Sequence, residues 1–125
     1  AKYRIKKIKY IKGFYENTIT DELSDKMKEY PPSIIYIDVD MYSSTITVLN
    51  WIDKIALPGT IIYFDDVWGT GNHPESGEQK AIIEYNALNN TRCFLTEDPT
   101  SYGSKTVFRF LLKDPEKNAQ FKGYE

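Results

Sequence analysis

Two short apolar runs, each followed at once by acidic residues, dominate the pattern of the chain. Residues 34–37 read Ile-Ile-Tyr-Ile and precede Asp-Val-Asp at 38–40, while residues 61–64 read Ile-Ile-Tyr-Phe and precede Asp-Asp at 65–66. Runs of β-branched and aromatic residues without polar alternation are typical of parallel strands covered on both faces. The pattern therefore predicts two buried strands whose carboxyl ends carry acids.

A helix is predicted between these strands, from Ser44 as its N-cap to Ile55. The Pro-Gly pair at 58–59 ends it, and its apolar side chains share one face: Ile46, Leu49, Ile52 and Ile55. A strand–helix–strand crossover is right-handed almost without exception. Both acidic clusters are therefore expected at the same edge of the sheet, where open α/β sheets bind ligands.

The segments on either side of this unit continue an α/β pattern. We predict a strand over 7–12, helices over 21–30 and 75–88, and strands over 92–95 and 106–112, with a turn at 99–104. The second helix is expected to face inward through Ala81, Ile82, Tyr85 and Leu88. We treat residues 1–125 as a single partial domain: a strand and helix at 1–32, the central unit at 33–66, a loop, helix and two strands at 67–113, and a polar tail at 114–125.

The first twelve residues alternate basic with apolar side chains. Lysines that neutralise phosphates and tyrosines that stack on bases would suit nucleic acid. The preferred interpretation is a strand with solvated lysines, since charged side chains also protect sheet edges from mispairing.

Composition narrows the class of protein. The chain has 125 residues, 16 basic and 18 acidic side chains, and a net charge of −2, so no overall field draws it to nucleic acid or a membrane. The single cysteine, Cys93, excludes an internal disulfide and suits a reducing cytosol, and no apolar run approaches the roughly 20 residues of a membrane span. We expect a cytoplasmic protein with no nucleic-acid or membrane partner. The start at Ala1, without an initiator Met, suggests a piece of something longer.

The two acidic clusters suggest a metal site. Carboxylates crowded at one edge repel each other, and a hard divalent cation with oxygen ligands relieves that repulsion. Asp38 and Asp40 point the same way if the strand continues through them, whereas Asp65 and Asp66 point opposite ways unless the strand ends between them. The alternative is that these acids only cap helices or solvate strand ends.

Several motifs in order resemble the macrocin O-methyltransferase family. They are Ile-Asp-Val-Asp-Met-Tyr-Ser-Ser-Thr at 37–45, Leu-Pro-Gly at 57–59, Ile-Tyr-Phe-Asp-Asp at 62–66, Gly-Glu-Gln-Lys-Ala at 77–81, and Ile-Lys-Gly-Phe-Tyr-Glu-Asn-Thr at 11–18. The resemblance covers about residues 8–112. It implies an enzyme that uses S-adenosylmethionine and Mg²⁺ to methylate a hydroxyl of a sugar or glycosylated small molecule.

The resemblance also implies roles for individual residues. It carries the metal ligands over to Asp38, Asp65 and Asp66, with Asp38 also acting as the general base. We assign Asp40, Tyr42, Trp68 and His73 to the acceptor side, although Trp68 could simply anchor its loop and His73 could be solvated. Val67 and Thr60 stand where the family has Tyr and Gly, which bears on the acceptor more than on the metal.

The fold that the resemblance implies is a Rossmann-like class I methyltransferase sheet. Such sheets run in the order 3-2-1-4-5-7-6, and this chain is expected to be the carboxyl-terminal part, without the first two strands. Strands four, five, seven and six would remain neighbours. Because those first two strands hold most of the cofactor, no cofactor-binding residue is assigned.

Three other functions stay open. A haloacid-dehalogenase-like phosphatase also places Asp-x-Asp after an apolar strand, a metal-dependent glycosyltransferase uses Asp-x-Asp on a nucleotide-sugar, and a truncated domain could bind metal or assemble without catalysis. The acceptor, the choice of divalent ion and a possible homo-oligomer are not decided by the sequence.

Overall fold

The computed structural model describes residues 7–68, 73–98, 106–114 and 116–118. Helices and strands follow one another as α1 (Tyr15–Thr18), α2 (Asp21–Glu29), β1 (Ile34–Ile37), α3 (Tyr42–Ile55), β2 (Thr60–Phe64), α4 (Gly77–Ala87), β3 (Cys93–Glu97) and β4 (Thr106–Leu112). No helix in these ranges is long and apolar enough to cross a membrane.

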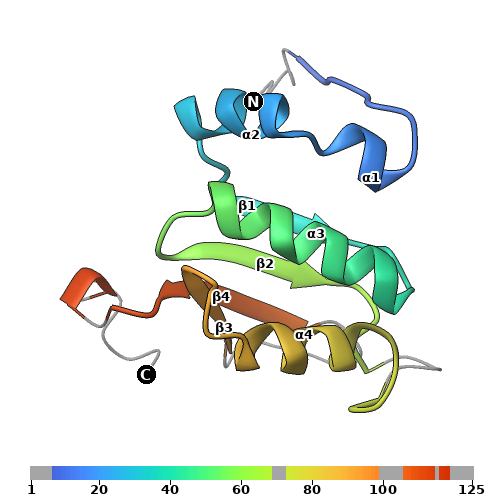
Figure 1. Cartoon of the computed structure of the whole chain (residues 1–125), viewed down its shortest axis with the longest axis vertical. Coiled ribbons are helices and arrows are strands. Elements are labelled where there is room, and N and C mark those ends of the chain that lie inside the picture. Colours follow the sequence, from blue (N-terminus) through green and yellow to red (C-terminus); the bar gives the residue numbers. More distant parts are fainter. Residues whose placement is uncertain (1–6, 69–72, 99–105, 115, 119–125) are drawn as a thin grey trace, which may run out of the picture.

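The four strands form one sheet in the order β1-β2-β4-β3 (Figure 1). Strand β1 pairs parallel with β2, whereas β4 runs antiparallel to both β2 and β3. The predicted neighbours, strands four, five, seven and six of a methyltransferase sheet, are confirmed in that spatial order. The carboxyl ends of β1, β2 and β3 therefore share one edge of the sheet with the amino end of β4.

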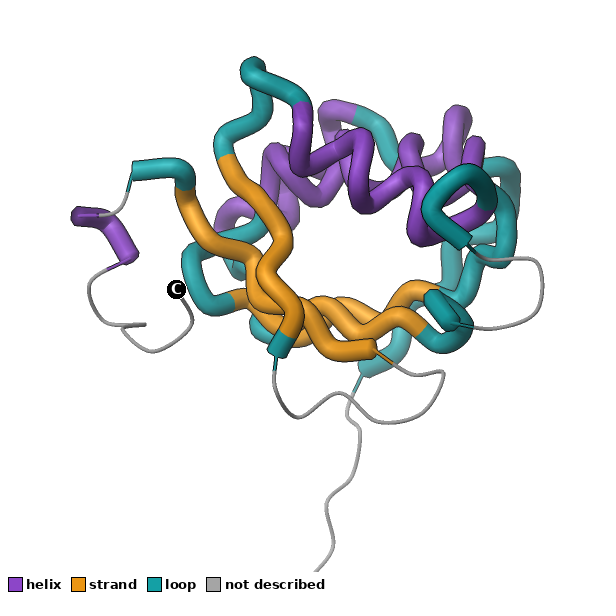
Figure 2. Tube along the Cα trace, turned by 90° about the horizontal axis from the view of Figure 1, so that it is seen from below, coloured by secondary structure: helices purple, strands orange, loops and turns teal. Residues whose placement is uncertain are grey.

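Helices α3 and α4 lie together against one face of the sheet (Figure 2). Strand residues alternate between the two faces, and those that point toward the helices are buried: Ile37, Ile62, Phe64, Cys93, Leu95, Phe108 and Phe110. Leu49 and Ile52 of α3 and Ala81, Ile82 and Tyr85 of α4 complete this core. The apolar spacing of both helices thus predicts the face that packs.

Strand β1 is not covered on both faces, so that part of the sequence prediction is wrong. Its side chains Ile34 and Tyr36 are 68% and 57% exposed, because β1 is an edge strand of this sheet and the helices cover only one face. Continuous apolar runs are typical of strands with layers on both sides. In the described part of the chain, only one such layer is present.

The helix between β1 and β2 begins three residues earlier than predicted. Met41 is its N-cap residue, so Ser44 lies inside the first turn and does not cap it. The predicted stop at Pro58-Gly59 is confirmed: the amide of Thr60 donates to the carbonyl of Leu57 at 3.0 Å, with Gly59 at φ 87°. Proline followed by a residue of positive φ is the signature of a type II turn.

Of the other helices, α2 matches its prediction closely, α4 does so in part, and the short α1 was not predicted. Helix α2 begins after Thr20, whose hydroxyl accepts from the amide of Leu23 at 3.2 Å. Helix α4 is shorter than expected, and Leu88 follows it at 42% exposure, so the prediction that Leu88 points inward is wrong. The predicted turn at 99–104 lies outside the described residues.

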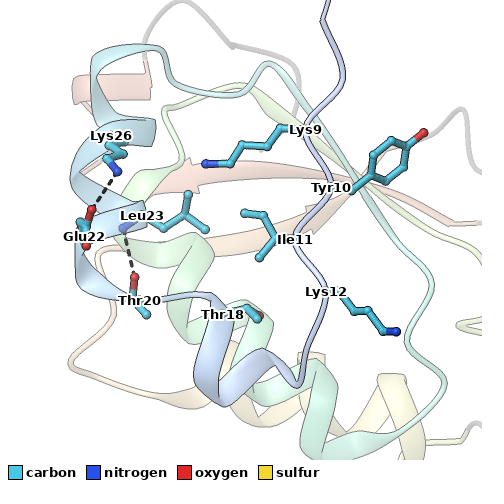
Figure 3. Close-up of a pocket in the computed structure, with 9 residues that line it drawn as sticks. All are labelled: Lys9, Tyr10, Ile11, Lys12, Thr18, Thr20, Glu22, Leu23 and Lys26. Carbon is cyan, nitrogen blue, oxygen red and sulfur yellow. Dashed lines mark hydrogen bonds and ion pairs between the residues drawn. The ribbon is translucent and has the colours of Figure 1, made fainter.

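The predicted strand at the amino-terminal end is also wrong. Residues 7–12 are extended and exposed but belong to no strand, because in the described structure they lie beside α2 and do not reach a sheet edge (Figure 3). Lys9 and Ile11 point toward α2, whereas Tyr10 and Lys12 point away from it. The alternation is present, but the backbone hydrogen bonds that define a strand need a partner strand.

A hydrogen-bonded junction around Asp53 holds α3, α4 and β3 together. One carboxylate oxygen of Asp53 accepts from the hydroxyl of Tyr85 at 2.6 Å and from the amide of Cys93 at 3.1 Å, and the other accepts from the amide of Arg92 at 3.0 Å. The guanidinium of Arg92 donates to the carbonyls of Asp53 and Ala56 at the end of α3. The junction fixes α4 against the sheet and so positions the start of α4 at the acidic edge.

Candidate active site at the carboxyl edge of the sheet

Three carboxylates meet where β1 and β2 end. Asp38, Asp40 and Asp66 each offer one oxygen, and these oxygens all lie within 4.8 Å of one another. Asp38 and Asp40 are exposed, while Asp66 is half-buried. The parallel pairing of Ile37 with Phe64 brings the two acidic segments side by side, as expected from a strand–helix–strand unit.

A tight turn places Asp40 in this cluster. Strand β1 ends at Ile37, and the amide of Met41 donates to the carbonyl of Val39 at 2.6 Å across Asp40, whose φ is +58°. Asp is one of the few residues other than Gly that adopt positive φ readily. The carboxylates of Asp38 and Asp40 therefore converge through a turn, without the strand continuation that the sequence analysis considered.

Asp65 occupies a different position from its neighbour Asp66. Its carboxylate accepts a 2.5 Å hydrogen bond from the hydroxyl of Tyr36, and the Tyr36 ring stacks on Tyr63 with centroids 5.1 Å apart. This hydrogen bond raises the pKa of Tyr36 to about 12, since it favours the neutral phenol. The structure thus groups Asp38, Asp40 and Asp66, while Asp65 contacts Tyr36. The assignment of Asp38, Asp65 and Asp66 as metal ligands stays a prediction.

A fifth carboxyl group, Glu78, lies beside these acids. It belongs to the first turn of α4 and is 1% exposed. Burial raises its pKa to about 7, with smaller contributions from the negative charges of the four aspartates, the first of which is Asp66. The edge of the sheet therefore carries a buried acid that loses its proton only near neutral pH.

Sequence reasoning missed Glu78 as a site residue. The signal was present, because Glu78 lies three, four and seven residues before Ala81, Ile82 and Tyr85, and so stands on the buried face of α4. A charged residue in an inward-facing stripe is costly to bury and often marks a site.

The predicted acceptor-side residues do not all gather in one place. Tyr42 donates a hydrogen bond to Glu84 of α4, and Lys80 lies 4.9 Å from the centre of the Tyr42 ring, so Tyr42 links α3 to α4. Trp68 is 54% exposed, two residues after Asp66. His73 is exposed, and its Nδ1 accepts from the amide of Glu75 at 3.1 Å in the turn before α4. Only Asp40 lies within the carboxylate cluster.

Cavities adjoin this edge on two sides. One of about 370 Å³ lies between α1, α3 and β1 and reaches Asp38, with Trp51, Val48 and Ile35 among its apolar walls. A second, of about 170 Å³, lies between α4 and the sheet and includes Trp68. A third pocket, of about 420 Å³, lies away from the acids between residues 9–12 and α2, and its Lys26 pairs with Glu22 at 2.8 Å (Figure 3).

Comparison with known proteins identifies the fold. No protein-family model and no curated protein sequence matches the chain. Two solved structures of CalS11 match 79% of it at 22% identity; one is described as a calicheamicin methyltransferase and the other as a TDP-rhamnose 3'-O-methyltransferase in calicheamicin biosynthesis. Their TM-scores are 0.58 and 0.55, and the chain spans 36% and 40% of their lengths. The chain has the architecture of part of a Rossmann-like methyltransferase domain.

Proposed function

We propose that the chain is part of an O-methyltransferase that transfers a methyl group from S-adenosylmethionine to a hydroxyl of a sugar or glycosylated small molecule, with a divalent metal ion. The observation that carries the proposal is the cluster of Asp38, Asp40 and Asp66 at the carboxyl edge of a methyltransferase-like sheet. Membership in the macrocin O-methyltransferase family is part of the same proposal, on the motifs described above.

The residues at this edge fit a hard cation. Every donor in the cluster is a carboxylate oxygen, the ligand type that Mg²⁺ prefers, and two of the three acids are exposed and so accessible to an ion and a substrate. Asp38, Asp40 and Asp66 would hold the ion in the observed arrangement, whereas Asp65 takes the place of Asp40 in the ligand set that the resemblance implies. When bound, the ion would lower the pKa of a hydroxyl that contacts it.

The chain's own groups have separate roles in the transfer. Asp38 accepts the proton of the acceptor hydroxyl as its oxygen attacks the methyl carbon of the sulfonium, and the carbon–sulfur bond breaks to leave a thioether. Tyr36 restrains the Asp65 carboxylate through its 2.5 Å hydrogen bond. The positive-φ turn at Asp40 fixes that carboxylate beside Asp38, which provides orientation before the acceptor arrives.

Calorimetric titration with Mg²⁺ tests the metal site and chooses between the two ligand sets. We expect the unaltered chain to bind Mg²⁺ and Asp66→Asn to lose binding. Asp40→Asn weakens binding strongly if the observed cluster is the site, whereas Asp65→Asn does so if the ligands are those that the resemblance implies. Asp25→Asn is the matched control, because Asp25 is an exposed acid on α2 that pairs with Lys28.

A second titration with S-adenosylmethionine separates an enzyme from a metal-binding module. The titration uses a protein that contains this chain within a complete methyltransferase domain. We expect this protein to bind S-adenosylmethionine. Absence of uptake by that protein, with Mg²⁺ binding intact, would reject the methyltransferase proposal and favour the non-catalytic alternative. Loss of both would reject the metal site as well.

A further inference from the structure

The cavity beside Trp68 carries an inference about the acceptor. It is about 170 Å³ in volume, and it is lined by Val67, Trp68, Gln79, Ile82, Ile83, Glu97 and Phe108. We propose that this cavity binds an apolar six-membered ring, aromatic or saturated, that the acceptor carries next to its reacting hydroxyl. The proposal rests on the proposed function, because the ring belongs to an acceptor only if the protein is a methyltransferase. Binding of a ring to the cavity can nevertheless be tested without methyl transfer.

The sheet register places this cavity at the same edge as the carboxylates. Phe64 at the end of β2 pairs with Thr106 at the start of β4, and Phe108 of β4 pairs with Glu97 at the end of β3. Glu97 also lines the cavity. The cavity therefore lies across β4 from the acidic edge of β1 and β2, on the helix-covered face. Val67 and Trp68 join the two sites directly, since they follow Asp66 in the chain.

Packing and a hydrogen bond hold the inner walls of the cavity in place. Val67 is 2% exposed, and its carbonyl accepts a 2.8 Å hydrogen bond from the side-chain amide of Gln79. Phe108 is 7% exposed and packs edge-on against Phe64, with ring centroids 5.5 Å apart. The floor is thus part of the core, whereas Trp68 and Ile83, 54% and 51% exposed, form the rim. A rigid floor with an open apolar rim is typical of a small-molecule site.

The volume of the cavity limits the size of the group that it can bind. An apolar protein cavity of about 150 Å³ holds one benzene molecule, so a cavity of 170 Å³ fits a single six-membered ring and little more. Apart from Gln79 and Glu97 the lining residues are apolar, so a sugar ring, whose several hydroxyls all need hydrogen-bond partners, fits the cavity poorly. The sugar hydroxyl instead lies toward Asp66, and the apolar ring fills the space beside Trp68.

Titration with phenol tests the ring site on the chain itself. The indole N–H of Trp68 gives its own signal in a two-dimensional NMR spectrum, and replacing Trp51 by Phe identifies it, since the chain has two tryptophans. We expect a saturable shift of this signal with phenol and none with glucose. Ile83→Glu replaces an apolar side chain of the rim with a charged, solvated one and weakens phenol binding by about tenfold, because the ring loses apolar contact area on that side of the cavity.

Leu88→Glu is the matched control, because Leu88 is an exposed apolar residue at the end of the same helix and does not line the cavity. The Leu88→Glu variant should bind phenol with the same affinity as the unaltered chain. Non-saturable shifts, equal shifts in Ile83→Glu, or saturable binding of glucose in preference to phenol would overturn the proposal. None of these outcomes depends on the metal or the cofactor, so failure of the ring site and failure of the methyltransferase proposal are distinguishable.

Discussion

The buried acid Glu78 makes the stability of the chain depend on pH in a direction opposite to that of most carboxylates. Its pKa is raised from 4.5 to about 7 in the folded protein. Between these values the folded chain holds a proton that the unfolded chain has lost, so the free energy of unfolding falls as the pH rises. Below the lower value both states are protonated and the penalty vanishes. Above the upper value the penalty is complete.

The size of the effect follows from the shift. A difference of about 2.5 pKa units corresponds to about 3 kcal/mol at 1.36 kcal/mol per unit, and roughly 2.5 kcal/mol of it develops between about pH 5 and pH 8. At 1% exposure, Glu78 has almost no contact with solvent to screen this penalty. Glu78→Gln keeps the shape of the protonated side chain and removes the charge. We therefore expect it to be the more stable protein at the higher pH.

Urea denaturation followed by circular dichroism measures this directly. The free energy of unfolding is determined at about pH 5 and pH 8 for the unaltered chain, Glu78→Gln and Glu75→Gln. Glu75 is an exposed acid three residues earlier and serves as the control, with the same pH dependence as the unaltered chain. If Glu78→Gln shows that same dependence, Glu78 is not held protonated by burial and the reasoning is refuted.

Three further predictions concern the core. Asp53→Ala should lower the free energy of unfolding by about 3 kcal/mol, because it leaves the amides of Arg92 and Cys93 and the hydroxyl of Tyr85 without their acceptor; urea denaturation against an exposed control, Asp25→Ala, measures it. The thiol of Cys93, whose pKa burial raises to about 12, should not react with a thiol reagent near pH 8 until urea unfolds the chain; rapid reaction of the folded protein would contradict its burial. Leu49→Ala in the centre of α3 should cost about 3 kcal/mol and the exposed Leu57→Ala less than about 1 kcal/mol, and equal losses would refute the assigned core.

The hydrophobic pattern predicts a helix or strand of this chain well where that element packs against elements close to it in the sequence. Strands β1, β2 and β4 and helix α2 lie close to their predicted ranges. The segment 7–12 has the same alternation as a strand but forms none, because the pattern records which side chains could face a core and does not supply the partner strand. The predicted burial of β1 is wrong for the same reason. Whether Ile34 and Tyr36 are covered depends on which other elements pack against that face of the sheet.

The candidate site shows where sequence reasoning ends. That acids follow both strands is evident from the chain, and the parallel pairing of strands joined by a helix places their carboxyl ends at one edge. Which carboxylates meet depends on details of the backbone, such as the positive φ of Asp40 and the hydrogen bond between Tyr36 and Asp65. The position of Glu78 depends on how α4 docks, which the Asp53 junction sets from the opposite end of the helix.

The sequence by itself determined the α/β class and the edge at which the acids gather, because these follow from local periodicity and from the parallel pairing of the strands in a strand–helix–strand unit. The order of the strands was implied by the resemblance to the methyltransferase family. Only the tertiary structure decided that Asp38, Asp40 and Asp66 converge, that Glu78 is buried beside them and that an apolar cavity opens next to Trp68. Local patterns indicate which faces of helices and strands are apolar enough to be buried. Distances between side chains from different elements depend on how those elements pack, and packing is a property of the whole chain.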